Sequence, residues 1–156
     1  MSFRSILFSV LFSLTFVDAA SSQELKFISP TSKKTVEGAA PIASIKYDAC
    51  FKKKKNQDVH IDSVKSVSDG KMLSFSLFKK GDIQKHTDLN LSEKGSFRLH
   101  FEVIQILSEE RLPYTDDNRP VQYDLSKGVC IYYTLAGNRK TAIINNFKEL
   151  PGEAHP

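Results

Sequence analysis

The chain lacks the short motifs that identify many enzymes. It contains no Gly-x-Ser-x-Gly, no phosphate-binding loop, no zinc-binding cysteine pairs and no His-Glu-x-x-His, which disfavours the hydrolases, nucleotide-binding proteins and zinc proteins that carry them. Tryptophan is absent and cysteine occurs only twice. After the first 19 residues no apolar run approaches the ~20 residues that a membrane-spanning helix needs. The fold and function are therefore inferred from the alternation of apolar and polar residues, from the distribution of charge, and from the few cysteines, histidines and tyrosines.

Residues 1–19 are predicted to be a secretory signal peptide. Arg4 supplies the positive charge, residues 6–17 are apolar apart from serine and threonine, and Val17 and Ala19 suit the −3 and −1 positions of a cleavage site. The apolar run is about a dozen residues long, too short to span a bilayer. A buried N-terminal helix or membrane anchor is the alternative. Residues 149–156 contain no hydrophobic tail, so a glycosylphosphatidylinositol anchor is not expected.

Removal of 19 of the 156 residues leaves a chain of single-domain size. We expect a polar leader over 20–24, a folded domain over 25–147 and a flexible C-terminal tail over 148–156. The formal net charge is +4, and four lysines are consecutive: Lys52, Lys53, Lys54 and Lys55. Such a run can attract an anionic lipid surface, a polyanion or an acidic glycan. The alternative interpretation is an exposed loop whose charges contribute little to stability. Nucleic acid is not an expected partner without a wider basic face.

Apolar residues alternate with polar ones along most of the folded domain. Residues 97–103 place apolar side chains at odd positions, and residues 129–135 repeat the pattern, as half-buried strands do. A strand over 25–29 is predicted to end at Pro30, with a polar turn over 31–38 and a strand over 42–51. Turn signals such as Asp69-Gly70 recur every eight to twelve residues or so. We expect an all-β fold, a single antiparallel β-sandwich of about eight or nine strands, with a barrel as the alternative.

Cys50 and Cys130 are predicted to form one structural disulfide, because an exported chain meets an oxidising compartment. Each cysteine lies opposite the main apolar row of its strand, which places the bond toward the outer or edge side of a sheet. It would stabilise the fold by roughly 4–5 kcal/mol. A catalytic free thiol is the alternative, and it requires a neighbouring base.

Residues 25–47 carry a resemblance: Leu-Lys-Phe-Ile-Ser-Pro opens the stretch, Thr35-Val36-Glu37-Gly38 follows, and Ile45-Lys46-Tyr47 closes it. This order resembles the immunoglobulin-like N-terminal domain of secreted fungal cell-wall proteins linked to β-glucan synthesis and assembly. Tyr47 stands where tryptophan is common in that family, and the Ser/Thr-rich tail of such proteins is missing. The resemblance implies an immunoglobulin-like, non-catalytic extracellular domain. It transfers no functional residue.

Residues 124–130 are also similar to the approach to the second cysteine of immunoglobulin domains. Gly128 stands where those domains have tyrosine, and no tryptophan is available to pack on a disulfide. We therefore expect an immunoglobulin-like sandwich rather than an antibody-type domain.

Tyrosines and one sequon are the candidate contact and modification sites. Tyr114 and Tyr123 flank the longest irregular segment and are candidate contacts for a sugar or a partner, or half-buried anchors. Tyr132 is a further candidate for stacking on sugars, whereas Tyr133 shares the apolar row and is assigned to the core. Asn90 begins the only N-glycosylation sequon, which matters in a eukaryotic secretory route.

Two histidine–carboxylate pairs are the candidate metal ligands. His60 and Asp62 share one strand face, and His100 and Glu102 share another. Such pairs on neighbouring strands form a metal site, whereas solvated strand faces are the ordinary alternative. Neither a metal nor another cofactor is predicted.

The expected function is binding: a secreted, non-enzymatic domain, extracellular or in a cell wall, whose partner is an extracellular protein or polysaccharide. A lipid or small-ligand carrier is the second hypothesis, prompted by 11 phenylalanines, and it requires an apolar cavity between the sheets. A small metal-dependent enzyme is the third. It requires convergence of His60, Asp62, His100 and Glu102.

Cleavage is expected after Ala19 when the chain is expressed in a secreting host. N-terminal sequencing of protein from the medium should begin at Ala20, and Ala19→Gln should block processing, because the −1 position accepts small residues. Secreted protein that starts at Met1, or complete retention in cells, would contradict the predicted signal peptide.

Overall fold

The structure is a computed structural model that describes residues 25–38, 41–54, 57–82, 85–86, 89–108 and 115–155. The predicted signal peptide 1–19, the leader 20–24, Lys55 and Tyr114 lie outside the described residues. Within those ranges the chain is all β apart from one 3-10 turn, Asp116–Asn118. No helix there is long and apolar enough to cross a membrane.

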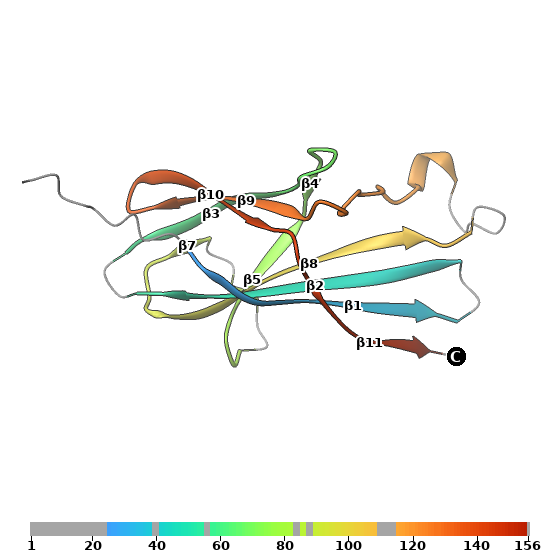
Figure 1. Cartoon of the computed structure of the whole chain (residues 1–156), viewed down its shortest axis with the longest axis horizontal. Helices are drawn as coiled ribbons and strands as arrows, with labels where there is room; N and C mark the ends of the chain where they lie inside the picture. The colour runs from blue at the N-terminus through green and yellow to red at the C-terminus, as the bar shows by residue number, and fades with distance from the viewer. Residues whose placement is uncertain are drawn as a thin grey trace, which may run out of the picture.

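Two β-sheets pack face to face (Figure 1). Sheet A has the strand order β11 (Lys148–His155), β1 (Phe27–Glu37), β2 (Ile42–Lys53), β8 (Gly95–Ile106), β5 (Phe75–Lys79) and β6 (Lys85–His86). Sheet B has the order β10 (Asn138–Ile144), β9 (Val129–Leu135), β3 (Val59–Ser66) and β4 (Met72–Leu73), and β7 (Asn90–Leu91) also pairs with β3. The predicted all-β sandwich is confirmed, although the described residues form eleven strands rather than the predicted eight or nine. Neither sheet closes on itself in the described part of the chain, so the barrel alternative is wrong.

The core fills the space between the sheets with the alternating rows that the sequence predicted. β8 buries Phe97, Leu99, Phe101 and Val103, and β9 buries Val129, Ile131, Tyr133 and Leu135. Phe51 of β2 packs on Phe97 with ring centroids 5.8 Å apart. Burial of these rows is the main stabilising term, because removal of apolar surface from water drives folding.

The first strand is longer than predicted. β1 continues through Pro30 to Glu37, so the predicted stop at Pro30 and turn over 31–38 are wrong. Ser29 has a φ of 50°, and the register with β2 shifts between Ile28 and Thr31. Pro30 therefore lies in a bulge, where its missing N–H removes no ladder hydrogen bond.

The C-terminal residues form an edge strand, not the predicted flexible tail. β11 pairs in parallel with β1, which also makes the sandwich only mostly antiparallel. Its described side chains, from Lys148 to Ala154, are all exposed, so the strand is held by the backbone ladder and the Lys33–Glu153 ion pair. A strand without a buried row has no apolar alternation to detect.

Gly128 fixes the entry of the chain into β9. Its φ is 84°, and a Cβ added to it would lie 2.0 Å from the carbonyl oxygen of Ile144. Its N–H donates to the Leu125 carbonyl at 2.9 Å, and its carbonyl accepts from the Val67 N–H at 3.0 Å. The position therefore needs both a positive φ and a missing side chain, which only glycine supplies.

Gly128→Ala is expected to lower the free energy of unfolding by about 3 kcal/mol or more, because backbone strain and a clash with backbone add together. Urea denaturation of the mature chain measures it. Gly137→Ala is the matched control: Gly137 has a φ of 80° but nothing within 4 Å of an added Cβ, so strain alone should cost about 1–2 kcal/mol. Equal losses in the two variants would contradict the close packing at Gly128.

Candidate functional site

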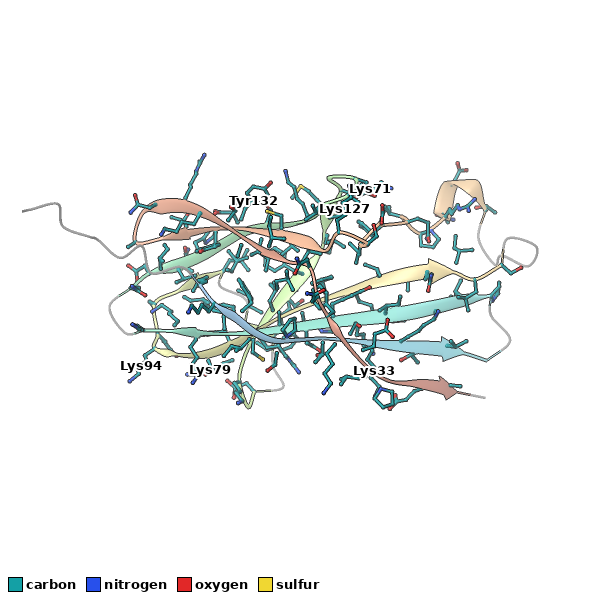
Figure 2. The ribbon with its side chains drawn as sticks, viewed as in Figure 1. Lys33, Lys71, Lys79, Lys94, Lys127 and Tyr132 are labelled. Atoms are coloured by element: carbon teal, nitrogen blue, oxygen red, sulfur yellow. The ribbon has the colours of Figure 1, made fainter. Side chains whose placement is uncertain are left out.

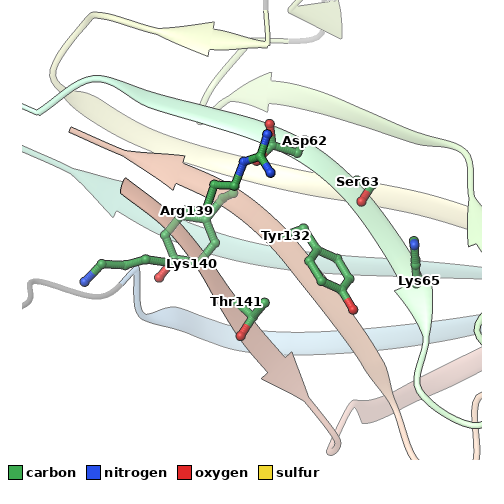
Figure 3. Close-up of a pocket in the computed structure, with 8 residues that line it drawn as sticks. Asp62, Ser63, Lys65, Tyr132, Arg139, Lys140 and Thr141 are labelled. Carbon is green, nitrogen blue, oxygen red and sulfur yellow. The ribbon is translucent and has the colours of Figure 1, made fainter. Parts of the chain in front are cut away.

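The outer face of sheet B carries a groove of about 410 Å³ (Figure 3). We call it the sheet B groove and define it by the residues that line it: Asp62, Ser63, Lys65, Tyr132, Tyr133, Arg139, Lys140 and Thr141. They come from three neighbouring strands, β3, β9 and β10. Tyr133 is completely buried, so it forms part of the floor, while the other side chains supply an aromatic ring, hydroxyls and charges.

A β-bulge in β3 shapes one wall of the groove. Ile61 pairs with Tyr133 and Ser63 pairs with Tyr132, which makes Asp62 the extra residue. Because of the bulge, the buried positions of β3 change from odd to even numbers: Val59 and Ile61 are buried before it, and Val64 after it. Consecutive side chains at 62 and 63 therefore line the groove, which a regular strand does not permit.

Tyr132 lies at the centre of the groove. Its pairing partners are Thr141 on β10 and Ser63 on β3, so a hydroxyl stands on each side of the ring in one row across three strands. Directly opposed side chains in a ladder have Cβ atoms about 5 Å apart. Tyr132 is 38% exposed, and Figure 2 places its side chain along the outer side of sheet B.

The phenol of Tyr132 stays neutral around neutral pH. A hydrogen bond with the side chain of Cys130, the charge of Cys130 and burial all raise the pKa of Tyr132 above its ordinary value of 10. The ammonium of Lys65 lies 5.3 Å from the centroid of the same ring, which is a cation–π distance. The ring therefore already attracts a cation through its face.

Positive charge exceeds negative charge in the groove. Lys65, Arg139 and Lys140 are the cations that line it, and Asp62 is the one carboxylate. The Thr134 hydroxyl donates a hydrogen bond of 3.2 Å to the carboxylate of Asp62. The Nε2 atom of His60 lies 3.6 Å from the other oxygen of the same carboxylate. No carboxylate of a described residue forms an ion pair with any of the three cations. Elsewhere Lys33, Lys71 and Lys79 are each paired with a carboxylate.

The lysine run differs from the predicted exposed loop. Lys52 and Lys53 are the last residues of β2, and Lys53 is only 3% exposed. Its ammonium donates to the carbonyls of Ser92 at 2.9 Å and Lys54 at 3.2 Å. The inward row of β2 simply continues from Phe51 to Lys53, and carbonyls compensate the buried charge. Lys52 and Lys54 are exposed as predicted.

The predicted disulfide is contradicted, because Cys50 and Cys130 are both free thiols. Each lies outside its strand's buried row, as predicted, but β2 belongs to sheet A and β9 to sheet B. The cysteines therefore face outward on opposite sides of the sandwich. Packed sheets lie about 10 Å apart, whereas a disulfide needs Cα atoms within about 7 Å of each other.

The two histidine–carboxylate pairs do not converge. His60 and Asp62 are on β3 of sheet B, and His100 and Glu102 are on the outer face of β8 in sheet A. His100 Nδ1 instead lies 3.0 Å from a carboxylate oxygen of Asp48. The described ranges hold no group of three or more histidine, cysteine or acidic side chains that suits a metal ion. The geometry required by the metal-dependent enzyme is not met.

The remaining candidates lie away from the groove. Tyr123 is half-buried and packs against the core, which matches the anchor alternative for this residue. It lines a smaller cavity of about 270 Å³ together with Tyr47, Val103 and Gln122. Asn90 is exposed in the short strand β7.

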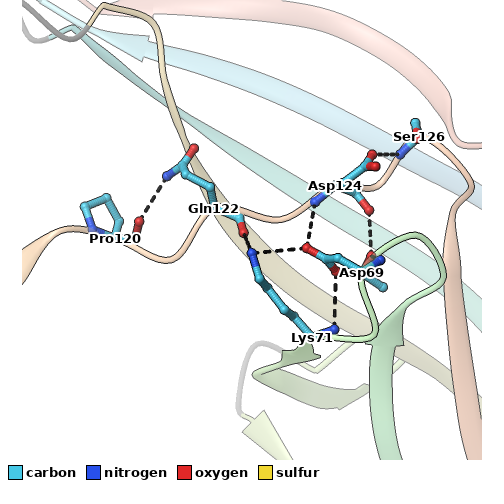
Figure 4. A network of polar contacts seen from close by, with 7 residues as sticks. Asp69, Lys71, Pro120, Gln122, Asp124 and Ser126 are labelled. Carbon is cyan, nitrogen blue, oxygen red and sulfur yellow. Dashed lines mark hydrogen bonds and ion pairs between the residues drawn. The ribbon is translucent and has the colours of Figure 1, made fainter.

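The segment that carries Tyr123 is tied to the β3–β4 turn by polar contacts (Figure 4). Asp69 accepts hydrogen bonds from the N–H groups of Lys71 and Asp124 and forms an ion pair of 3.2 Å with the Lys71 ammonium. Lys71 also donates to the carbonyl of Gln122 at 2.6 Å. The Ser66 hydroxyl is the strongest of several groups that lower the pKa of Asp69 from 3.8 to about 2; Lys71 and Asp124 are the others.

Asp69 is expected to stabilise the fold above pH 4 and to lose that contribution as the pH falls through about 2, since its folded pKa lies below the unfolded one. Asp69→Asn should therefore unfold at lower urea concentration than the unaltered chain at pH 5, with a smaller difference at pH 2.5. Asp58→Asn, at an exposed carboxylate, is the control. A difference that is independent of pH would contradict the role of the charge.

Comparison with known proteins adds no relative. No family model matches the chain, and neither a curated protein nor a solved structure matches it. The geometry of the sheet B groove is therefore the basis on which a function can be proposed.

Proposed function

We propose that the protein is a secreted, non-enzymatic β-sandwich of the immunoglobulin-like type that binds an extracellular polysaccharide, in a cell wall or matrix, through the sheet B groove. The observation that carries the proposal is the row Thr141–Tyr132–Ser63, which sets an exposed aromatic ring between two hydroxyls. A sugar ring has an apolar face that packs on an aromatic side chain and hydroxyls that exchange hydrogen bonds with polar neighbours.

The form of the groove supports a polymer ligand. It is a depression on a sheet face, whereas sites for small molecules enclose most of the ligand surface. Its ring and hydroxyls project from three hydrogen-bonded strands, so little side-chain and loop ordering is lost on binding. An open, preorganised face suits the side of an extended chain.

Export and glycosylation are parts of the same proposal. The signal peptide predicted from residues 1–19 would bring the chain to an extracellular compartment. Asn90 is exposed and is proposed to carry a glycan in a eukaryotic route. It lies on β7, which pairs with the Val59–His60 end of β3.

The carrier hypothesis has less support. Phe51, Phe97 and Phe101 are at most 1% exposed and pack inside the sandwich, which gives the phenylalanines a structural role. The cavity beside Tyr123 has Gln105, Gln122 and Ser126 in its wall. The wall of this cavity is therefore partly polar, whereas a carrier of a lipid chain needs an apolar lining.

Tyr132→Ala should weaken polysaccharide binding about tenfold or more, because the stacking surface is lost; tenfold corresponds to about 1.4 kcal/mol. Tyr132→Phe should bind nearly as well as the unaltered chain. Affinity electrophoresis of the mature protein in gels that contain acidic or neutral polysaccharides measures both.

Met72→Ala is the matched control, since Met72 is 63% exposed on the edge strand β4 of the same sheet. It should leave binding unchanged. The proposal fails if no polysaccharide retards the mature chain, or if Tyr132→Ala binds as well as the unaltered protein while remaining folded.

A further inference from the structure

We infer that the sheet B groove selects an extended anionic polysaccharide, a polymer of uronic acid units, over a neutral one. The inference rests on the proposed function, because it assigns the ligand class of the same groove. It is carried by the position of the cations around Tyr132 rather than by the net charge of the chain.

Lys65 and Arg139 flank Tyr132 in the strand register. Lys65 pairs with Cys130, two residues before Tyr132 on β9, and Arg139 pairs with Thr134, two residues after it. They also stand on opposite neighbouring strands of β9. Strand rise and strand spacing place their Cα atoms on the order of 16 Å apart, with Tyr132 between them. An extended chain that lies along this diagonal passes the ring of Tyr132 and comes within reach of both side chains.

The groove's cations are not neutralised by carboxylates of the residues that the structure describes. Asp62 is the one lining carboxylate, and Thr134 and His60 already contact it. Figure 3 shows Arg139 extended toward Asp62, yet Asp62 forms no ion pair with Arg139, Lys65 or Lys140, so none of the three lining cations has a carboxylate partner among the described residues. A ligand with carboxylates supplies the missing negative charge, and charge-assisted hydrogen bonds are stronger than neutral ones.

The ring of Tyr132 already contacts one of these cations. The Lys65 ammonium lies over the ring of Tyr132. A neutral sugar that stacks there displaces the cation from the ring and offers it only weak partners. A uronate offers Lys65 its carboxylate in exchange, so the same displacement is compensated. The contact therefore favours an anionic sugar over a neutral one of the same shape.

The mature protein should be titrated with polygalacturonate, with its methyl ester, with neutral dextran and with poly-L-glutamate at low and high salt. Polygalacturonate should bind at least tenfold more tightly than the methyl ester or dextran, and the difference should shrink at high salt because screening weakens exposed charge pairs. Monomeric galacturonate should bind much more weakly, since one ring cannot reach both cations. Poly-L-glutamate should bind more weakly than polygalacturonate, because it has no sugar face for Tyr132.

The test variant is Lys65→Gln with Arg139→Gln, which should lose tenfold or more in affinity for polygalacturonate. Lys52→Gln with Lys54→Gln is the matched control: it removes the same charge from two exposed lysines at the end of β2 in sheet A. Its affinity should stay within twofold.

The outcomes separate the inference from the proposed function. Tyr132-dependent binding that is equally tight for neutral dextran or the methyl ester would overturn the inference and leave the proposed function standing. Poly-L-glutamate that binds as tightly as polygalacturonate would overturn it in favour of an acidic protein partner. An equal loss in the control variant would show that the charge effect is not local and would also overturn it. Failure of every polysaccharide to bind would defeat both.

Discussion

The burial of Tyr133 between the two sheets determines which face of β9 meets solvent. Tyr133 is completely buried, and its hydroxyl accepts a hydrogen bond of 3.1 Å from the N–H of Leu25, next to the start of β1. The polar end of this large side chain is therefore satisfied inside the core, as buried hydroxyls require. Because side chains alternate along a strand, a fixed inward Tyr133 makes Tyr132 point outward. The exposed ring of the sheet B groove is a consequence of the core.

The bulge at Asp62 completes the arrangement. It lets β3 keep Ile61 and Val64 in the core while Asp62 and Ser63 both line the groove. A regular strand with Ile61 buried would also bury Ser63 and would expose Val64. The bulge thus stabilises the core and places a hydroxyl beside Tyr132 at the same time. Bulges often have this role of redirecting side chains near functional sites.

The sequence predicted the features that depend on the alternation of apolar and polar residues along a strand. It did not predict the features that depend on which strands, far apart in the sequence, pair with each other. The rows of β8 and β9, the two-layer sandwich and the burial of Tyr133 follow from the period of two. β11 has no buried row, so its pairing with β1 left no trace in the local pattern. The disulfide prediction failed for a related reason: the outward direction of both cysteines was deduced correctly, but the sheet to which each strand belongs is not a local property.

The groove was predictable only in part. The position of Tyr132 on the polar face of its strand was visible, and the spacing from Ile61 to Val64 was a signal of the bulge. The approach of Lys65 and Arg139 to the same ring depends on the registers of β3 and β10 with β9. The lysine run attracted attention because it is continuous in sequence, yet one of its members is buried. The cations of the sheet B groove lie close together in space although Lys65 is far in the sequence from Arg139 and Lys140.

An NMR titration of the mature protein with an oligogalacturonate tests the central claim most directly, because it locates the contact without altering a residue. The account predicts amide shift changes along the row Thr141–Tyr132–Ser63 and its neighbours on sheet B, with the outer face of sheet A around Arg98 and His100 unaffected. Changes confined to sheet A, or spread evenly over both faces, would contradict the assignment of binding to the sheet B groove.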